Sequence, residues 1–93
     1  MLGKAPAGQV RNIIAVRAGE TPANITLQGL LVEKCPIAGC WFYLQDGTGT
    51  IKVDTKAAGF VVVNVPLQTR VIVSGNVLNE SEGASLEATG IRY

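Results

Sequence analysis

Histidine is absent from this chain, and with it the residue that proteins use most often as a general acid or base and as a metal ligand. Serine and threonine therefore lack the usual base that turns a hydroxyl into a nucleophile. No spacing pairs two carboxylates as general acid and general base among Asp46, Asp54, Glu80, Glu82 and Glu87. These absences predict a protein that is not an enzyme and that carries no metal and no cofactor.

Charge of either sign is also scarce. Charged residues make up 16% of the chain, and 8 basic residues against 7 acidic ones leave a formal charge of +1. A dedicated nucleic-acid-binding protein usually has a stronger positive bias. The balance lowers the expectation of that function and leaves room only for a local basic patch.

No long apolar run is present either. A bilayer span needs roughly 18 consecutive apolar residues, and no stretch of the sequence approaches that length, so we expect no membrane partner. Residues 1–10 also lack a charged segment followed by an apolar one, which is the pattern of a secretory signal. An exported parent with its signal removed would have the same sequence, so the pattern predicts no location.

The 93 residues fit a single domain with a modest core. Hydrophobic residues reach 47%, which argues against disorder. Residues 1–9, with several Gly, Ala and Pro, are predicted to form a flexible leader, and residues 10–93 the single domain. The apolar segment Val10 to Ala18 has no clear period. It fits a single helical turn or an extra edge strand that packs across the end of a barrel.

The stretch from Trp41 to Val53 is typical of a β-hairpin. Successive side chains of a strand point to opposite faces, and both halves of this stretch alternate around Asp-Gly-Thr-Gly, a turn sequence in which Asp46 bonds its own backbone two residues on. The apolar side is predicted to carry Phe42, Leu44, Ile51 and Val53. The other side is predicted to carry Trp41, Tyr43, Gln45 and Lys52.

Three further strands are predicted, from Ile25 to Lys34, Arg70 to Leu78 and Ser85 to Tyr93. Gly29 inside the first of them indicates a bulge or a sharp bend, as where a strand passes from one side of a barrel to the other. Asp54 to Gly59 has room for one helical turn. The pattern predicts an all-β fold, a five-stranded Greek-key barrel with a short N-terminal extra segment and at most one short helix between strands 3 and 4.

Three pieces of the sequence carry a family resemblance: TLxG from Thr26, FxLxDGTGxIxV from Phe42 and VxVxGxV from Val71. They resemble the OB-fold domains of the tRNA- and helicase-associated, nucleic-acid-binding type, and they are similar to small stand-alone bacterial OB-fold proteins, which are often exported. The resemblance covers residues 25–53 and 70–93 and implies an OB-type barrel. It implies less about function, because OB barrels host nucleic-acid, sugar, metal-linked and purely structural roles.

The resemblance implies that a ligand lies on the outer face of strands 2 and 3, flanked by the loops 35–40 and 79–84. Trp41 and Tyr43 could each stack on a base there, with basic neighbours following the phosphates. Packing of both rings against the protein itself is the competing interpretation. The predicted nucleic-acid-binding residues are Trp41, Tyr43, Lys52, Lys34, Lys56 and Gln45.

Acidic residues beside this face suit phosphates poorly, since Asp54 follows the hairpin and Glu80 and Glu82 lie in the last loop. The leading prediction is nevertheless a non-catalytic OB-fold module that binds single-stranded nucleic acid. The alternatives are a self-associating structural or protein-interaction domain, and an exported OB protein with a disulfide or thiol site at Cys35 and Cys40.

Cys35 and Cys40 flank a short loop that contains Pro36 and Gly39. Three interpretations stay open: a disulfide, two inert small hydrophobic residues, or a metal-binding or redox pair. Two thiolates make only half of a tetrahedral zinc site, which a homodimer would have to complete. The C-x4-C spacing also differs from the C-x-x-C of redox enzymes.

The segment Phe60 to Val65 is β-branched and nearly all apolar. Such a run usually indicates a buried strand. In a compact barrel it could instead fill the space that a helix usually takes in an OB fold. At a sheet edge it would pair with the same segment of a second chain, so a homo-oligomer through Phe60-Val65 is the second predicted partner, beside single-stranded nucleic acid.

Overall fold

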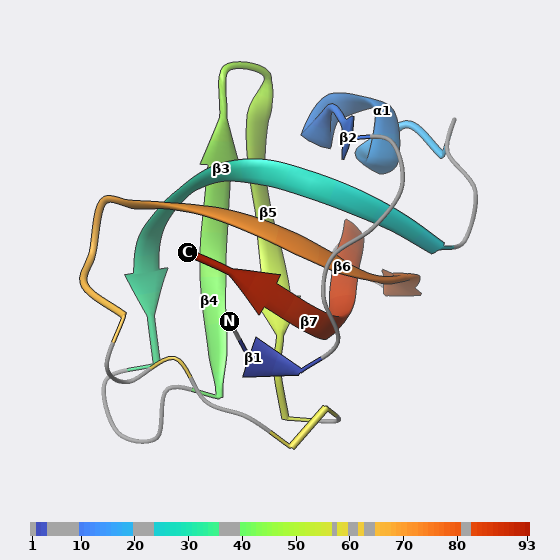
Figure 1. The fold of residues 1–93 in the computed structure, drawn as a ribbon. Helices are drawn as coiled ribbons and strands as arrows, with labels where there is room; N and C mark the ends of the chain where they lie inside the picture. The colour runs from blue at the N-terminus through green and yellow to red at the C-terminus, as the bar shows by residue number, and fades with distance from the viewer. Residues whose placement is uncertain are drawn as a thin grey trace.

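The strands of the computed structural model form one closed ring (Figure 1). The structure describes residues 2–3, 10–19, 24–35, 40–56, 58–59, 62, 65–80 and 83–93. In chain order the elements are β1 (Leu2–Gly3), β2 (Val10–Arg11), α1 (Ile13–Arg17), β3 (Asn24–Lys34), β4 (Trp41–Asp46), β5 (Gly49–Asp54), β6 (Thr69–Glu80) and β7 (Gly83–Arg92). The long strands pair in the circuit β3-β4-β5-β7-β6-β3, antiparallel everywhere except between β5 and β7. The predicted five-stranded all-β barrel is confirmed.

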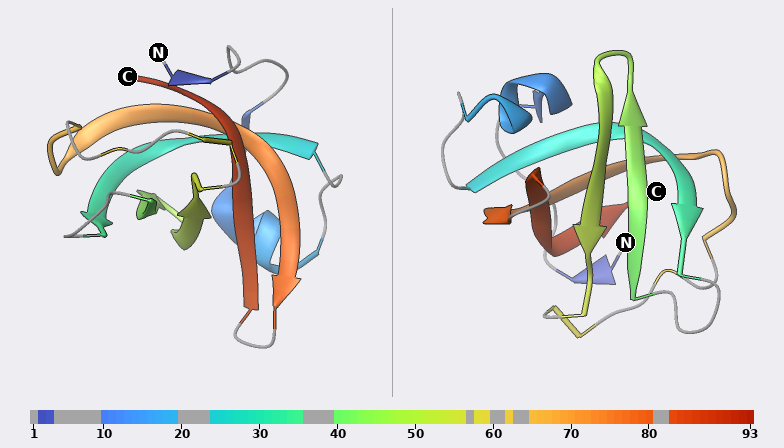
Figure 2. Two further views of the ribbon diagram at one scale, coloured as in Figure 1. Left: turned by 90° about the horizontal axis from the view of Figure 1, so that it is seen from below. Right: turned by 180° about the vertical axis from the view of Figure 1, so that it is seen from behind.

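Two short strands extend this ring. β1 pairs with β7 through Leu2↔Ile91 and Gly3↔Gly90, so the start of the chain lies beside its last strand (Figures 1 and 2). β2 pairs in parallel with β3. The segment from Val10 onward thus provides both of the predicted alternatives, an edge strand and a helical turn. Residues 1 and 4–9 of the predicted leader lie outside the described residues, and their flexibility stays a prediction.

Helix α1 packs against β5 and β7 and closes one end of the barrel. Ile13 and Val16, three positions apart on one helix face, are 0% and 1% exposed, whereas Ile14 on another face is 56% exposed. The sequence left room for one short helix between strands 3 and 4. The described residues of that connection form turns instead, with the Ala58 N–H donating to the Thr55 carbonyl at 3.2 Å. In the part of the chain that the structure describes, no helix is long and apolar enough to span a bilayer.

The predicted alternation of the hairpin is confirmed. β4 and β5 pair in register from Trp41↔Asp54 to Asp46↔Gly49 around a two-residue turn. All of the side chains predicted to face inward are buried, and they are Phe42, Leu44, Ile51 and Val53. The opposite side of the hairpin therefore forms an outer surface of the barrel.

Strand β3 bends at Gly29, as predicted. The two residues after Gly29, Leu30 and Leu31, each pair with both β4 and β6. Leu30, for example, lies opposite Gln45 of β4 and opposite Arg70 of β6. A Cβ on Gly29 would collide with the Gln45 carbonyl oxygen and lie 2.9 Å from its carbon. No side chain fits there, because β3 passes directly against the β4 backbone while it turns from one side of the barrel to the other.

Of the interpretations of Phe60 to Val65, the described residues fit the one in which the segment fills space in the barrel, and they do not fit a strand. Neither Val62 nor Val65 belongs to a strand, and the Val65 N–H donates to the Val62 carbonyl at 3.0 Å in a turn. Both side chains are buried in the core of the same barrel, at 0% and 1% exposure. Val62 and Val65 thus fill the barrel, and its ring of strands closes without them. Residues 60, 61, 63 and 64 lie outside the described residues, so a homo-oligomer through this segment stays a prediction.

Candidate functional site

The outer face of β4 and β5 brings together most of the predicted site residues. The half-exposed rings of Trp41 and Tyr43 meet edge to face, with their centroids 5.5 Å apart at an interplanar angle of 70°. Lys52 is exposed opposite Tyr43 in register, and its ammonium lies 5.8 Å from the Trp41 ring centroid. Gln45 is exposed further along β4. The aromatic pair and the cation orient one another, which gives this face a defined surface.

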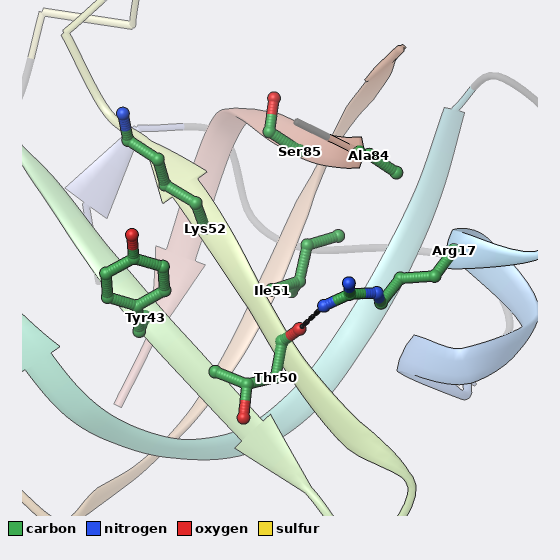
Figure 3. Close-up of a pocket in the computed structure, with 8 residues that line it drawn as sticks. Arg17, Tyr43, Thr50, Ile51, Lys52, Ala84 and Ser85 are labelled. Atoms are coloured by element: carbon green, nitrogen blue, oxygen red, sulfur yellow. Dashed lines mark hydrogen bonds between the residues drawn. The ribbon is translucent and has the colours of Figure 1, made fainter. Parts of the chain in front are cut away.

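A pocket of about 170 Å³ opens beside Tyr43. Figure 3 shows that Tyr43 and Lys52 lie on one side of it and Arg17, which reaches in from α1, on the other. The full lining is Arg17, Tyr43, Thr50, Ile51, Lys52, Gly83, Ala84 and Ser85. A pocket lined by an aromatic ring and by two cations is suited to a ligand that carries both a ring and a negative charge.

Arg17 is held in place by contacts between parts of the chain that lie far apart in the sequence. The Arg17 Nη1 donates to the Thr50 carbonyl at 2.9 Å (Figure 3). At the other end of α1, the Ile13 N–H donates to Asp46 Oδ2 at 2.9 Å and the Ile14 N–H donates to Thr48 Oγ1 at 3.1 Å. Asn12, the residue at the N-cap position, makes no side-chain cap bond. The hairpin turn thus caps the helix and sets where its cation points.

Asp46 is the centre of this arrangement. Its Oδ1 accepts hydrogen bonds from the Thr48 N–H at 2.7 Å, the Thr48 hydroxyl at 2.6 Å and the Gly49 N–H at 3.1 Å. Partial burial favours the neutral acid, but the bonds from Thr48, Ile13 and Gly49 outweigh it and lower the pKa of Asp46. The prediction that Asp46 bonds its own backbone two residues on is confirmed, and the cap on α1 was not predicted.

Lys34 is not brought to this face. A β-bulge between Leu31 and Glu33 shifts the register, so that Glu33 lies opposite Tyr43 and Lys34 lies opposite the inward-facing Phe42. The Lys34 ammonium donates to the Val65 carbonyl at 2.6 Å. A single extra residue in a strand reverses which side chains face outward, and regular alternation cannot predict this.

Carboxylates surround the Trp41 end of the face. Asp54 lies opposite Trp41 in the β4–β5 ladder, and Glu87 of β7 lies opposite Asp54. Lys56 is exposed on the turn after β5, where its N–H donates to Asp54 Oδ1 at 2.8 Å. The acidic residue expected beside the face is therefore present, whereas Glu82 and the side chain of Glu80 lie outside what the structure describes.

A second, shallower groove of about 340 Å³ continues the same face past Gln45 and over β3. Arg70 of β6 stands at its far end, and the remaining lining residues are Gln28, Gly29, Leu30, Gln45, Asp46 and Gly47. Sequence reasoning missed Arg17 and Arg70, because neither belongs to the hairpin. No pattern in the sequence around Arg17 or Arg70 marks either residue as part of a site.

Cys35 and Cys40 lie at the base of the β3–β4 loop as half-exposed thiols that are not disulfide-bonded. Partial burial and the neighbouring Cys35 thiol raise the pKa of the Cys40 thiol. Among the residues that the structure describes, no three His, Cys, Asp or Glu side chains gather as metal ligands.

Comparison with known proteins agrees with the topology. The sequence model of the bacterial OB fold (BOF) protein family matches residues 4–93. The solved structure titled as the hypothetical protein ygiW from E. coli superposes with a TM-score of 0.69 at 24% identity, over 94% of this chain and 91% of that one. An identity this low shows the fold alone. The search of curated proteins gives no match. The resemblance to OB-fold proteins is confirmed, and the nucleic-acid-binding type stays a prediction.

Proposed function

The chain belongs to the bacterial OB fold family, and from this premise we propose that it is a non-catalytic binding module that holds single-stranded nucleic acid on the outer face of β4 and β5. One observation carries the proposal: the Tyr43 ring and Lys52 line one side of a pocket and Arg17 lines the other. The outer face of these two strands is also where OB barrels bind oligonucleotides.

The size of the pocket limits what enters it. A cavity of about 150 Å³ holds a benzene-sized ring, so the 170 Å³ beside Tyr43 holds one ring and not a stack of rings. A nucleobase can pack on Tyr43 while its phosphate lies between Arg17 and Lys52. The guanidinium has five N–H donors, and the bond to Thr50 uses one of them, which leaves donors directed at the ligand.

Two neighbouring features extend the proposed binding surface on either side of the pocket. Trp41 lies next to Tyr43 on the same face and offers a second stacking surface. In the other direction the groove past Gln45 leads to Arg70, a third cation that can meet a phosphate. A strand of a few nucleotides would then run from Arg70 to Trp41.

The charges predict modest affinity with modest salt dependence. Glu33, Asp54 and Glu87 offset much of the local positive charge. If the phosphates meet only Arg17 and Lys52, the logarithmic salt slope is about −1.4, and raising salt from about 50 to about 150 mM weakens binding about fivefold.

The same carboxylates favour a second candidate, an oligosaccharide. Sugar rings pack on aromatic side chains, and their hydroxyls donate to carboxylates such as Asp54 and Glu87 beside Trp41. OB barrels bind oligosaccharides on this face as well. An uncharged sugar chain releases no counterions, so its binding would have almost no salt dependence.

Titrations of dye-labelled oligothymidylate and of a neutral oligosaccharide, each at two salt concentrations, test both candidates. For nucleic acid we expect Tyr43→Ala to weaken binding about tenfold or more, and Arg17→Gln or Lys52→Gln to weaken it and flatten the salt slope. Arg11→Gln is the matched control, because Arg11 is an exposed cation that lines neither cavity. Oligothymidylate binding that none of the three site variants weakens would refute the proposal. Binding of the sugar alone would replace it with the second candidate.

A further inference from the structure

Asp46 connects the two cavities of the proposed binding face. It lines the groove of about 340 Å³. Its Oδ2 also accepts the Ile13 N–H of α1 at 2.9 Å, and α1 is the helix that carries Arg17 into the pocket of about 170 Å³. A carboxylate repels a polyanion that passes beside it. On charge alone, Asp46 should therefore weaken the binding of nucleic acid.

The Asp46 carboxylate is occupied by donors of the protein itself. An ionised carboxylate has about four acceptor sites. Asp46 accepts four hydrogen bonds, from the N–H groups of Ile13, Thr48 and Gly49 and from the Thr48 hydroxyl. These bonds leave little capacity for the donors of a ligand. Asp46 is thus built to hold parts of the chain together and not to contact a ligand.

The parts that it joins are the hairpin turn and a helix too short to hold its own position. α1 has five residues, no acidic residue in its first turn and an N-cap residue, Asn12, without a side-chain cap bond. Isolated helices this short are unstable in water, so α1 depends on its buried face and on the caps that Asp46 and Thr48 supply. Arg17 lies about 6 Å along the helix axis from Ile13. A shift at the capped end therefore moves the guanidinium at the other end.

We propose, on the premise of the function proposed above, that Asp46 is a positioning residue that raises the affinity of this face for single-stranded nucleic acid by holding Arg17 in the pocket through α1. Thr48 assists, because its hydroxyl accepts the Ile14 N–H at 3.1 Å and donates to Asp46 Oδ1 at 2.6 Å. Positioning of Arg17 and repulsion of the phosphates act in opposite directions. The sign of the change in affinity when Asp46 is replaced shows which of them is larger.

The test is a titration of dye-labelled oligothymidylate at about 50 and about 150 mM salt. Asp46→Ala should weaken binding about threefold to tenfold, because a fully held hydrogen bond to a charged group contributes about tenfold or more. The logarithmic salt slope should change from about −1.4 to about −0.7, as when one of two phosphate contacts is lost. Asp54→Ala is the matched control, because the Asp54 carboxylate accepts the Lys56 N–H and not a bond from α1. It should strengthen binding, since it removes a repelling charge and leaves α1 capped.

Two further comparisons separate the placement of Arg17 from a general loss of structure. In the double variant Asp46→Ala/Arg17→Gln, the loss caused by Asp46→Ala should disappear, because no guanidinium is left to be placed. Thr48→Val removes a cap and keeps the Asp46 charge, so it should weaken binding about twofold or more, and Thr48→Ser should restore it. Circular dichroism checks that each variant is folded. Thr48 is exposed, so Thr48→Val decides the question if Asp46→Ala does not fold.

Failure of the positioning role and failure of the binding site give different results. If Tyr43→Ala and Arg17→Gln weaken binding but folded Asp46→Ala binds as tightly as wild type or more tightly, the positioning role is refuted. An equal loss from Asp46→Ala with and without the Arg17 guanidinium would refute it as well. If oligothymidylate does not bind the wild type, or binds independently of Tyr43 and Arg17, the proposed function fails and the positioning role fails with it.

Discussion

Replacement of Asp46 by alanine should remove the hydrogen bonds that join the hairpin turn to α1, and so lower the stability of the folded protein. The carboxylate accepts four hydrogen bonds, from the N–H groups of Ile13, Thr48 and Gly49 and from the Thr48 hydroxyl. Loss of a helix cap costs about 0.5–2 kcal/mol. The turn donors are near solvent, so water replaces part of their bonds and each adds less than the roughly 1.5 kcal/mol of a bond to a charged group.

The total expected for Asp46→Ala is about 2–3 kcal/mol of unfolding free energy, which corresponds to a fall in Tm of about 10–15 °C for a domain of this size. Asp54→Ala is the matched control, because Asp54 accepts one backbone N–H, that of Lys56, in an otherwise similar local turn. It should cost about 0.5–1 kcal/mol. Urea unfolding followed by circular dichroism measures both variants. An Asp46→Ala cost no larger than that of Asp54→Ala would refute the capping argument.

The pH dependence gives an independent check of the same argument. The pKa of Asp46 is lowered in the folded chain, so the charged carboxylate stabilises the folded state at pH values above the ordinary Asp pKa of about 3.9. That contribution is lost as the pH falls through the lowered folded pKa. The difference in stability between wild type and Asp46→Ala should therefore be constant near neutral pH and shrink in acid. A difference that stays constant down to the acid transition would show that the charge does not carry the effect.

Three further predictions concern the barrel and the thiols. Gly29→Ala should cost about 3 kcal/mol, because its Cβ meets the backbone of β4, whereas Gly47→Ala, with nothing within 4 Å, should be nearly neutral in the same urea assay. Thr26→Val should cost about 1–3 kcal/mol, since it deprives the buried Ser74 hydroxyl of a partner 2.7 Å away, and Thr26→Ser, which keeps the hydroxyl, should recover most of that in thermal unfolding. Alkylation of Cys40 in a Cys35→Ser variant should accelerate from neutral to alkaline pH, with no plateau at neutral pH, and a rate that does not change over this range would contradict a protonated thiol.

The site itself was only partly predictable. Alternation along a strand and the chemistry of a turn are local properties, so the outward positions of Trp41, Tyr43 and Lys52 could be predicted from the hairpin sequence alone. Arg17 could not, because its position depends on a helix capped by Asp46, which lies 33 residues from Ile13 in the sequence. Lys34 could not either, because a bulge in β3 reverses its side.

Local patterns in the sequence were enough to predict the all-β class, the hairpin with its buried and exposed sides, and the bend of β3 at Gly29. Each of these follows from side-chain period or from a backbone that no Cβ can approach. Two outcomes needed the folded barrel: which cations line the pocket with Tyr43, and the burial of Val62 and Val65 in the core. Those outcomes depend on contacts between distant segments, and the free energy of such contacts is set by the closed barrel and not by the residues next to them in the chain.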